Sequence, residues 1–281
     1  MLAFTSGHRV RFIGFFAALA AAFALTGPAR AADAPPLRIA ADAVPHAEIL
    51  AYAQKITPGL KLDIIEIPNG VNPNELLAHG DVDANYFQHV PYLHSQEQAL
   101  GQTFVVAAAV HIEPLGVYSR KYSRLDQVPD GATVAVPNNV TNLSRALFLL
   151  QGQGLVKLKA GVTGAERSLA TPRDIVWNPK HLKVLEIESP QLPRSLDDVA
   201  LAVINGNYAL EAGLSPAKDA LGLEAVAGNP YANVLVTTPR LASDPRIKRL
   251  ADVLASARVG AYIRERYRGS VIPVHPAGSG S

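Results

Sequence analysis

The chain has 281 residues, of which 48% are hydrophobic and 18% are charged, so it can bury a sizeable core without disulfides or structural metals. Its formal net charge of +2 argues against disorder and against a protein that binds nucleic acid through many phosphate contacts. The absence of cysteine excludes disulfides, thiolate metal sites and cysteine nucleophiles.

The first 31 residues have the features of a secretory signal peptide. Arg9 and Arg11 precede an uncharged, largely apolar run over residues 12–26, and Ala29 and Ala31 provide the small side chains of a cleavage site. A membrane-spanning helix needs about 20 apolar residues, which is longer than this run. We therefore expect cleavage near Ala31.

Pro28 bears on whether the protein is anchored to a membrane. It follows the segment 25–27 (LTG), where the signal peptide of a bacterial lipoprotein would place its lipidated cysteine. Because the chain has no cysteine, this anchor cannot form. We expect a soluble periplasmic protein without a lipid anchor.

The remaining chain alternates short apolar runs with helical patterns. The expected strands are residues 37–41, 60–67, 82–87, 132–136, 182–187 and 199–204. The expected helices are residues 45–56, 72–79 and 142–151, with a turn or short helix over 193–198. This alternation is typical of βαβ units and favours parallel sheets, so the fold class is α/β.

The order of elements occurs twice, which predicts two similar lobes. The segment 60–68 (LKLDIIEIP) resembles 182–190 (LKVLEIESP), and β-rich segments over 111–118 and 231–237 lie where the chain would cross between lobes. Amphipathic helices over 244–257 and 259–267 would return to the first lobe. A ligand is expected in the crevice at the carboxyl ends of the strands, with the two crossings as a hinge.

The expected domain boundaries follow from these crossings. Lobe one comprises residues 32–117 and 232–275, lobe two comprises 118–231, and residues 276–281 form a flexible tail.

Motifs for catalysis and for cofactor binding are missing from the sequence. It contains no GxGxxG, no Walker A loop, no HExxH and no GxSxG, and His89 and His94 are spaced too unfavourably to share a helix face. We predict no enzyme activity, no cofactor and no metal. An enzyme on the same scaffold, with Asp83 or His111 as general base, remains an alternative for which no orienting partner is evident.

Polar and aromatic residues at strand ends and helix starts form the candidate ligand site. Arg145 in the first turn of a helix suits a carboxylate, asparagine side chains suit an ammonium group, and aromatic rings suit an apolar tail. Taken singly, such residues are common in turns or in a core; together they describe a pocket for a zwitterion. The candidate residues are Tyr86, Phe87, His111, Asn142, Arg145, Asn205 and Asn233.

Six ordered segments resemble the methionine-binding NlpA/MetQ family of ABC-transporter substrate-binding proteins. They are PHAEILAYA, ANYFQHVPYL, HIEPLGVYSRKY, DGATVAVPNNVTNLSRAL, LDDVALAVINGNYALEAGL and PYANVLV, and the similarity extends over residues 37–273. The resemblance implies a two-lobed type II periplasmic binding protein that closes on methionine and delivers it to an ABC permease with its ATPase at the inner membrane.

The resemblance also implies roles for the candidate residues. Arg145 would bind the substrate carboxylate, and Asn205 and Asn233 would hold its amino and carboxylate groups. The thioether pocket would be lined by Tyr86, Phe87 and His111, with Asn142 as a further polar contact. The implied protein is a monomer that binds no nucleic acid. Another amino acid or a methionine-containing dipeptide remains an alternative ligand.

Overall fold

The computed structural model describes residues 34–68, 70–164 and 168–274. The chain divides into two units, Met1–Pro35 and Pro36–Ser281, and only the second is described below. The expected signal peptide, residues 1–31, and the expected tail, residues 276–281, lie outside the described residues.

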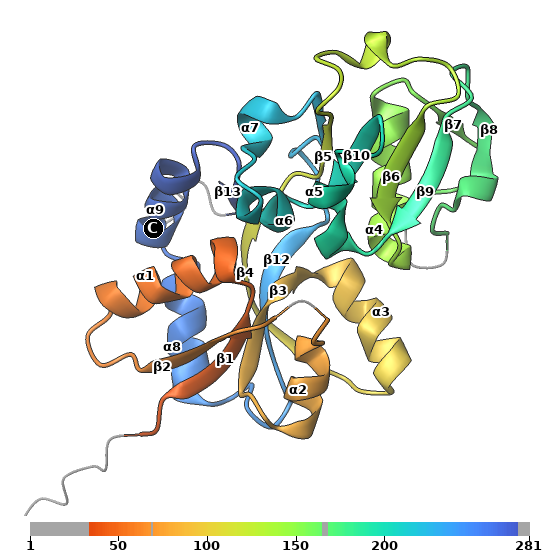
Figure 1. Ribbon diagram of the computed structural model, residues 1–281. Coiled ribbons are helices and arrows are strands. Elements are labelled where there is room, and N and C mark those ends of the chain that lie inside the picture. Colours follow the sequence, from red (N-terminus) through yellow and green to blue (C-terminus); the bar gives the residue numbers. More distant parts are fainter. Residues whose placement is uncertain (1–33, 69, 165–167, 275–281) are drawn as a thin grey trace, which may run out of the picture. The chain divides into compact units, whose positions relative to one another are not determined.

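A six-stranded mixed sheet forms the first lobe (Figure 1). Its strand order is β13-β4-β12-β3-β1-β2. The strands are β1 (Leu37–Ala41), β2 (Leu62–Glu66), β3 (Ala84–His89), β4 (Val105–Ile112), β12 (Ala232–Thr237) and β13 (Ile272–Pro273). Strand β1 runs parallel to β2 and β3, whereas β12 runs antiparallel to β3 and β4.

A five-stranded mixed sheet forms the second lobe, with the order β11-β5-β10-β6-β9. The strands are β5 (Gly116–Tyr118), β6 (Thr133–Pro137), β9 (Lys183–Ile187), β10 (Leu201–Ile204) and β11 (Gly222–Leu223). A separate ribbon pairs β7 (Lys157–Leu158) with β8 (Ile175–Trp177). The prediction of an α/β fold with two lobes is confirmed. The six strands that the sequence analysis expected pair in parallel, as predicted, whereas β5 and β12, which lie next to the crossings, run antiparallel to their neighbours.

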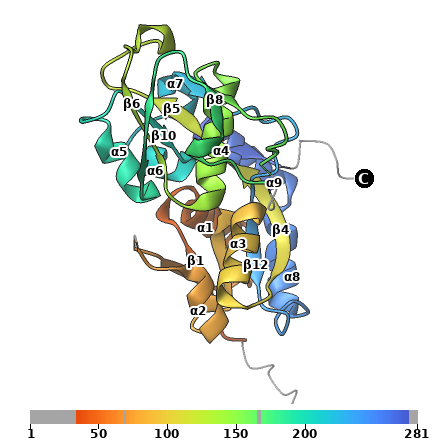
Figure 2. The ribbon, with the colours of Figure 1, turned by 90° about the vertical axis from the view of Figure 1, so that its right-hand side faces the viewer.

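Helices cover both faces of the first sheet (Figures 1 and 2). One face packs against α1 (Glu48–Ile56), α8 (Pro245–Leu254) and α9 (Ala257–Tyr267), and the other against α2 (Pro73–His79) and α3 (Val90–Leu100). In β1, Leu37 and Ile39 belong to the first core and Ala40 to the second, as the two-residue period of a strand requires. The C-terminal helices α8 and α9 therefore pack on the first sheet.

The second sheet is enclosed in the same way. Helix α4 (Val140–Gly152) covers one face, where Leu143 and Leu147 pack on Val134 and Val136. On the other face lie α5 (Leu192–Ser195) and α6 (Gly206–Glu211). The remaining short elements are α7 (Pro216–Asp219), η1 (Ala43–Ala47), η2 (Leu125–Gln127), η3 (Pro172–Asp174) and η4 (Ser189–Gln191). Among the described residues, no helix combines the length and the apolar character that a membrane crossing requires.

Two differences from the sequence analysis affect the site. Helix α3 was not expected, and it places Tyr92 beside the end of β3. Strand β5 belongs to the second sheet, so the chain leaves the first sheet after Ile112, a few residues before the expected boundary at 117. Residues 113–115 are therefore the first crossing, and residues 224–231 between β11 and β12 are the second.

Candidate functional site

A cleft of about 390 Å³ lies between the two sheets, which is in the size range of small-molecule sites. The first sheet contributes residues that follow β1, end β3 and begin β12, and the second contributes the starts of α4 and α6. From these elements the lining includes Asp42, Phe87, Gln88, His89, Asn138, Asn139, Asn142, Arg145, Asn205, Gly206, Asn207 and Asn233. The crevice at the strand ends is thus where the sequence analysis expected it.

Five of the seven candidate residues line this cleft: Phe87, Asn142, Arg145, Asn205 and Asn233. Tyr86 and His111 do not line it; both are fully buried, with exposures of 0%. Neighbouring side chains of a strand point to opposite faces, so Tyr86 turns away from the side on which Phe87 lies. The sequence analysis expected Tyr86 and His111 in the wall of the ligand pocket. In the structure they instead lie behind the residues that line the cleft.

Arg145 is held by an acidic partner that the sequence analysis missed. Its Nε donates to Oε1 of Glu224 at 2.8 Å, and its Nη2 donates to Oε2 of the same carboxylate at 2.5 Å and to the carbonyl oxygen of Glu113 at 2.9 Å. The guanidinium also lies 4.2 Å from the ring centre of Tyr231. Within the described part of the chain no hydrogen bond engages Nη1 of Arg145, and the residue lines the cleft.

The charges of Arg145 and Glu224 neutralise each other. Burial on its own would raise the pKa of Glu224, but the Arg145 guanidinium, together with hydrogen bonds from Asn229 and the Leu115 amide, holds that pKa below its ordinary value. Glu224 lies 79 residues after Arg145, in the second crossing, and no local motif marks it.

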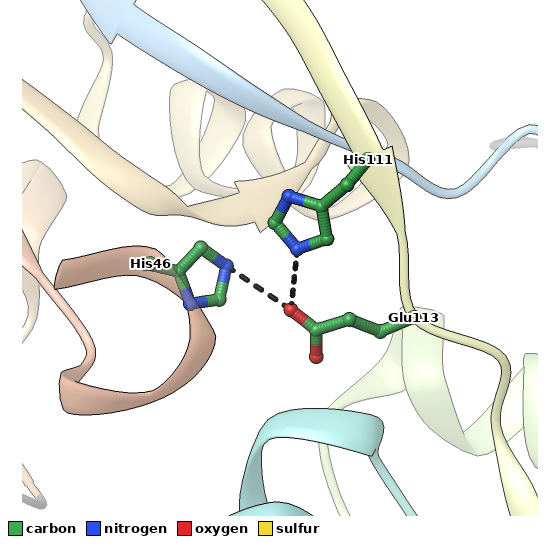
Figure 3. Close-up of side chains that lie close together, drawn as sticks. All are labelled: His46, His111 and Glu113. Carbon is green, nitrogen blue, oxygen red and sulfur yellow. Dashed lines mark hydrogen bonds and ion pairs between the residues drawn. The ribbon is translucent and has the colours of Figure 1, made fainter. Parts of the chain in front are cut away.

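Beside the cleft, His46, His111 and Glu113 form a buried cluster, the histidine–glutamate brace (Figure 3), in which Glu113 also lines the cleft. Oε1 of Glu113 lies 2.7 Å from Nε2 of His111 and 3.2 Å from Nε2 of His46. The hydroxyl of Tyr86 is hydrogen-bonded to Nδ1 of His111, and Nε2 of His46 lies 3.0 Å from Oδ1 of Asn233. The brace therefore fixes the position of Asn233, which does line the cleft.

The partners of His46 determine its protonation. Nε2 faces two oxygen acceptors and must carry the ring proton, whereas Nδ1 is buried without a partner. Burial lowers the pKa of His46 to about 4, so the ring is neutral near pH 7.

Glu113 also connects the two lobes. Its Oε2 accepts a hydrogen bond of 2.7 Å from the backbone N–H of Asn207, at the start of α6. Gly206 approaches so closely that a Cβ added there would lie 2.7 Å from Cβ of Glu113. Burial would raise the pKa of Glu113, but His46, His111 and the Asn207 amide together keep it below its usual range. Glu113 is thus a buried carboxylate that accepts from both lobes.

The brace is also where the described residues could hold a metal ion. Two imidazoles and one carboxylate resemble the ligand set of catalytic zinc sites, and their donor atoms lie within 4.8 Å of one another. These donor groups already bond one another, and Asn233, Tyr86 and Asn207 take up further atoms of the cluster. The arrangement therefore functions as a hydrogen-bonded support without requiring a metal.

His89 and Asp42 are lining residues of the first lobe that were not among the candidates. Nε2 of His89 lies 3.0 Å from Oδ1 of Asn142, and burial together with the nearby charge of Arg145 lowers the pKa of His89 to about 4. Asp42 follows β1, and its Oδ2 accepts a 2.9 Å hydrogen bond from Nδ2 of Asn207. His89 stands in the quoted segment 84–93, whereas only its place after a strand end could have indicated Asp42.

Asn205 has hydrogen-bonding capacity to spare. Its Oδ1 is buried and has no partner in the described part of the chain, and its side chain does not cap α6. Buried polar atoms are normally paired, so the unpaired Oδ1 of this cleft-lining residue is unusual.

The residues suggested for an enzyme are engaged elsewhere. Asp83 forms an ion pair of 2.9 Å with Arg38 and is not part of the cleft lining. Both ring nitrogens of His111 are occupied by Tyr86 and Glu113. Neither residue is available as a general base in the cleft.

The family model of the NlpA lipoproteins matches residues 37–275. The chain belongs to the NlpA lipoprotein family. Family membership confirms the resemblance seen in the six segments, and the members are substrate-binding proteins of ABC transporters without enzymatic activity.

Relatives of this NlpA-family chain are similar along most of their length. The D-methionine-binding lipoprotein MetQ of Escherichia coli K12 is 42% identical over 230 residues, which cover 80% of this chain and 83% of that protein. A nutrient-binding protein from Burkholderia cenocepacia, solved bound to methionine, is 43% identical with a TM-score of 0.80, covering 85% of this chain and 99% of that one. A periplasmic substrate-binding protein of an ABC transporter from Coxiella burnetii is 40% identical with a TM-score of 0.79, covering 85% and 100%.

Proposed function

We propose that this NlpA-family chain is the extracytoplasmic substrate-binding protein of an ABC importer, and that it binds free methionine in the cleft. The observation that carries the proposal is the unused hydrogen-bonding capacity of Arg145 Nη1 and Asn205 Oδ1 in the cleft wall. The methionine bound to the Burkholderia relative supports the choice of ligand.

The lining residues provide complementary contacts for this ligand. Arg145 binds the α-carboxylate through Nη1, and Nδ2 of Asn233 donates to the same carboxylate because His46 already occupies its Oδ1. The thioether lies against Phe87, with Tyr92 and His89 beside it, and Asn142 stays bonded to His89. Tyr86 and His111 act indirectly, by holding Glu113 and His46 in place.

Transport requires the two lobes to open and close about the crossings at residues 113–115 and 224–231. The closed lobes present their surfaces to an ABC permease, whose ATPase drives release. The protein acts outside the cytoplasm as a monomer that needs no cofactor.

Calorimetric titration tests the ligand. Residues 32–281 would be unfolded and refolded to remove any carried ligand, then titrated with L-methionine, with D-methionine, glycyl-methionine and leucine as comparators. We expect one-to-one, sub-micromolar binding of L-methionine that leucine does not match. Stronger binding of glycyl-methionine or of leucine would replace methionine within the same receptor class, and no binding of all four would refute the proposal.

A variant of Arg145 tests the carboxylate contact. Each charge-assisted hydrogen bond contributes about 1.5–3 kcal/mol, so Arg145→Ala is expected to weaken methionine binding by at least ~2 kcal/mol. Because that change also leaves Glu224 buried without its partner, the matched control is Arg145→Ala combined with Glu224→Gln. Tight binding by the double variant would refute the contact.

A further inference from the structure

Asp42 lines the cleft but is not among the residues to which we gave a contact with methionine. It lies directly after β1, and only its Oδ2 is engaged, by Nδ2 of Asn207 from the opposite lobe. No hydrogen bond to its Oδ1 occurs among the described residues, and the residue lines the cleft. One carboxylate oxygen is therefore directed to a ligand or to solvent.

The charges around the cleft lack a cation to match Asp42. Arg145 is the only arginine or lysine among the described lining residues, and Glu224 already neutralises it. The acidic lining residues are Asp42, Glu113 and Glu188. An ammonium group of a ligand would therefore meet in Asp42 an acid that no cation of the described lining neutralises.

The asparagines expected to hold an ammonium group are less suited to it than Asp42. Oδ1 of Asn233 is already bonded to His46, which leaves its amide nitrogen, a donor, for the ligand. Asn205 retains one amide oxygen, which is a neutral acceptor. A carboxylate forms a charge-assisted bond to an ammonium group that is about twice as strong as a neutral one.

We propose that Asp42 is the residue that receives the ammonium group of the ligand, together with Oδ1 of Asn205, and that Asp42 gives up a proton when the ligand binds. This inference rests on the proposed function, since it requires an amino-acid ligand in this cleft. Selection for a free amino group would then depend on Asp42.

The surroundings of Asp42 explain the proton. Burial, followed by the charges of Glu113 after β4 and Glu211 in α6, raises its pKa to about 8. Tyr208 of α6 and Tyr92 of α3 also face it, and no cation does so in the described part of the chain. At pH 7 the carboxyl group is therefore mostly protonated.

Binding changes this balance in one step. The O–H bond of the carboxyl group breaks and its proton passes to the buffer. The ligand ammonium keeps its own three hydrogens and donates one of them to the new carboxylate. With a pKa of about 8, roughly 0.9 proton should be released for each ligand bound at pH 7.

Calorimetry in two buffers with different ionisation enthalpies measures this release. For the full chain titrated with L-methionine at pH 7, the observed binding enthalpy should differ between the two buffers by roughly 0.9 times the difference in their ionisation enthalpies. Asp42→Asn, which keeps the shape of the side chain, should release no proton and bind about tenfold or more weakly. Glu66→Gln, an exposed acid at the end of β2 outside the cleft, should behave as the original chain.

A second ligand tests the same contact without a variant. Methionine without its amino group, 4-(methylsulfanyl)butanoate, should bind the original chain more weakly than methionine and release no proton. Tight methionine binding without proton release, or equal binding by Asp42→Asn, would overturn the role of Asp42 and leave the proposed function intact. Failure of the original chain to bind methionine would overturn both.

Discussion

The two sides of the cleft use similar polar residues for opposite purposes. On the side of the first sheet, the brace and Tyr86 are buried and almost fully hydrogen-bonded to one another. On the side of the second sheet, Arg145 and Asn205 keep polar atoms without a protein partner. The proposed ligand contacts Arg145 and Asn205 thus keep unpaired polar atoms in the cleft lining, whereas in the brace Nδ1 of His46 is the buried atom without a partner among the described residues.

The largest expected effect comes from removing the centre of the brace. Glu113→Ala leaves Nε2 of His111 and the Asn207 amide without their acceptor and removes one of the two acceptors of His46, so we expect it to lower the free energy of unfolding by about 3–5 kcal/mol. Urea denaturation measures the loss. Glu113→Gln retains an acceptor oxygen and should lose clearly less, and equal losses would show that the charge of Glu113 is what matters.

Arg145 should affect stability as well as binding. Arg145→Ala leaves the buried Glu224 without its counter-charge. We expect this to lower the free energy of unfolding by about 3–5 kcal/mol. The further change Glu224→Gln should restore part of this stability without restoring methionine binding. If the double variant regained binding, Arg145 would belong with the supports rather than with the ligand contacts.

Lowering the pH should destabilise the side of the first sheet. His46 and His89 have folded pKa values of about 4 and an unfolded value of about 6.5, so the unfolded chain takes up protons first as the pH falls. Each histidine should therefore remove up to about 2–3 kcal/mol of unfolding free energy between pH 6.5 and pH 4. Asp42 acts in the opposite direction, because its raised pKa makes the folded chain lose stability as the pH rises toward 8.

The Asp42→Asn background removes that opposing effect. In this background, stability measured by urea denaturation should fall steadily from pH 6.5 to pH 4, and His89→Gln should reduce the slope by about one proton. A slope that His89→Gln leaves unchanged would contradict a neutral, buried His89.

The smallest expected effect on stability separates two asparagines. Asn205→Ala removes a side chain without a partner for its oxygen, so it should change the free energy of unfolding by less than about 0.5 kcal/mol. Asn233→Ala breaks the bond to His46 and should cost about 1–2 kcal/mol. Both should weaken methionine binding, and an unaffected affinity for Asn205→Ala would remove it from the ligand contacts.

The sequence predicted the location of the cleft because strand ends and helix starts follow from the alternation of apolar runs. Arg145 and Asn205 were chosen in this way and both line the cleft, although α4 begins at Val140 and so places Arg145 in its second turn, whereas Asn205 directly precedes α6. Tyr86 and Phe87 were both expected in the wall, although the period of a strand allows only one of two neighbours to face it.

The partners of these residues could not be predicted. Glu224 meets Arg145 across 79 residues and His46 meets Asn233 across 187, so only the packed fold brings them together. Helix α3 was missed because its apolar side chains, apart from the buried Leu93, are distributed between partly exposed positions. Asp42 was missed because a single acid after a strand carries no local pattern.

Gly206, at the start of α6 in the second lobe, lies in close contact with Glu113 of the first crossing. A Cβ at position 206 would lie 2.7 Å from Cβ of Glu113, which is closer than two non-bonded carbon atoms can pack. The substitutions Gly206→Ala and Gly206→Ser would therefore push α6 progressively farther from the first crossing. At this point the missing side chain of Gly206 lets α6 approach Glu113 more closely than any other residue would allow.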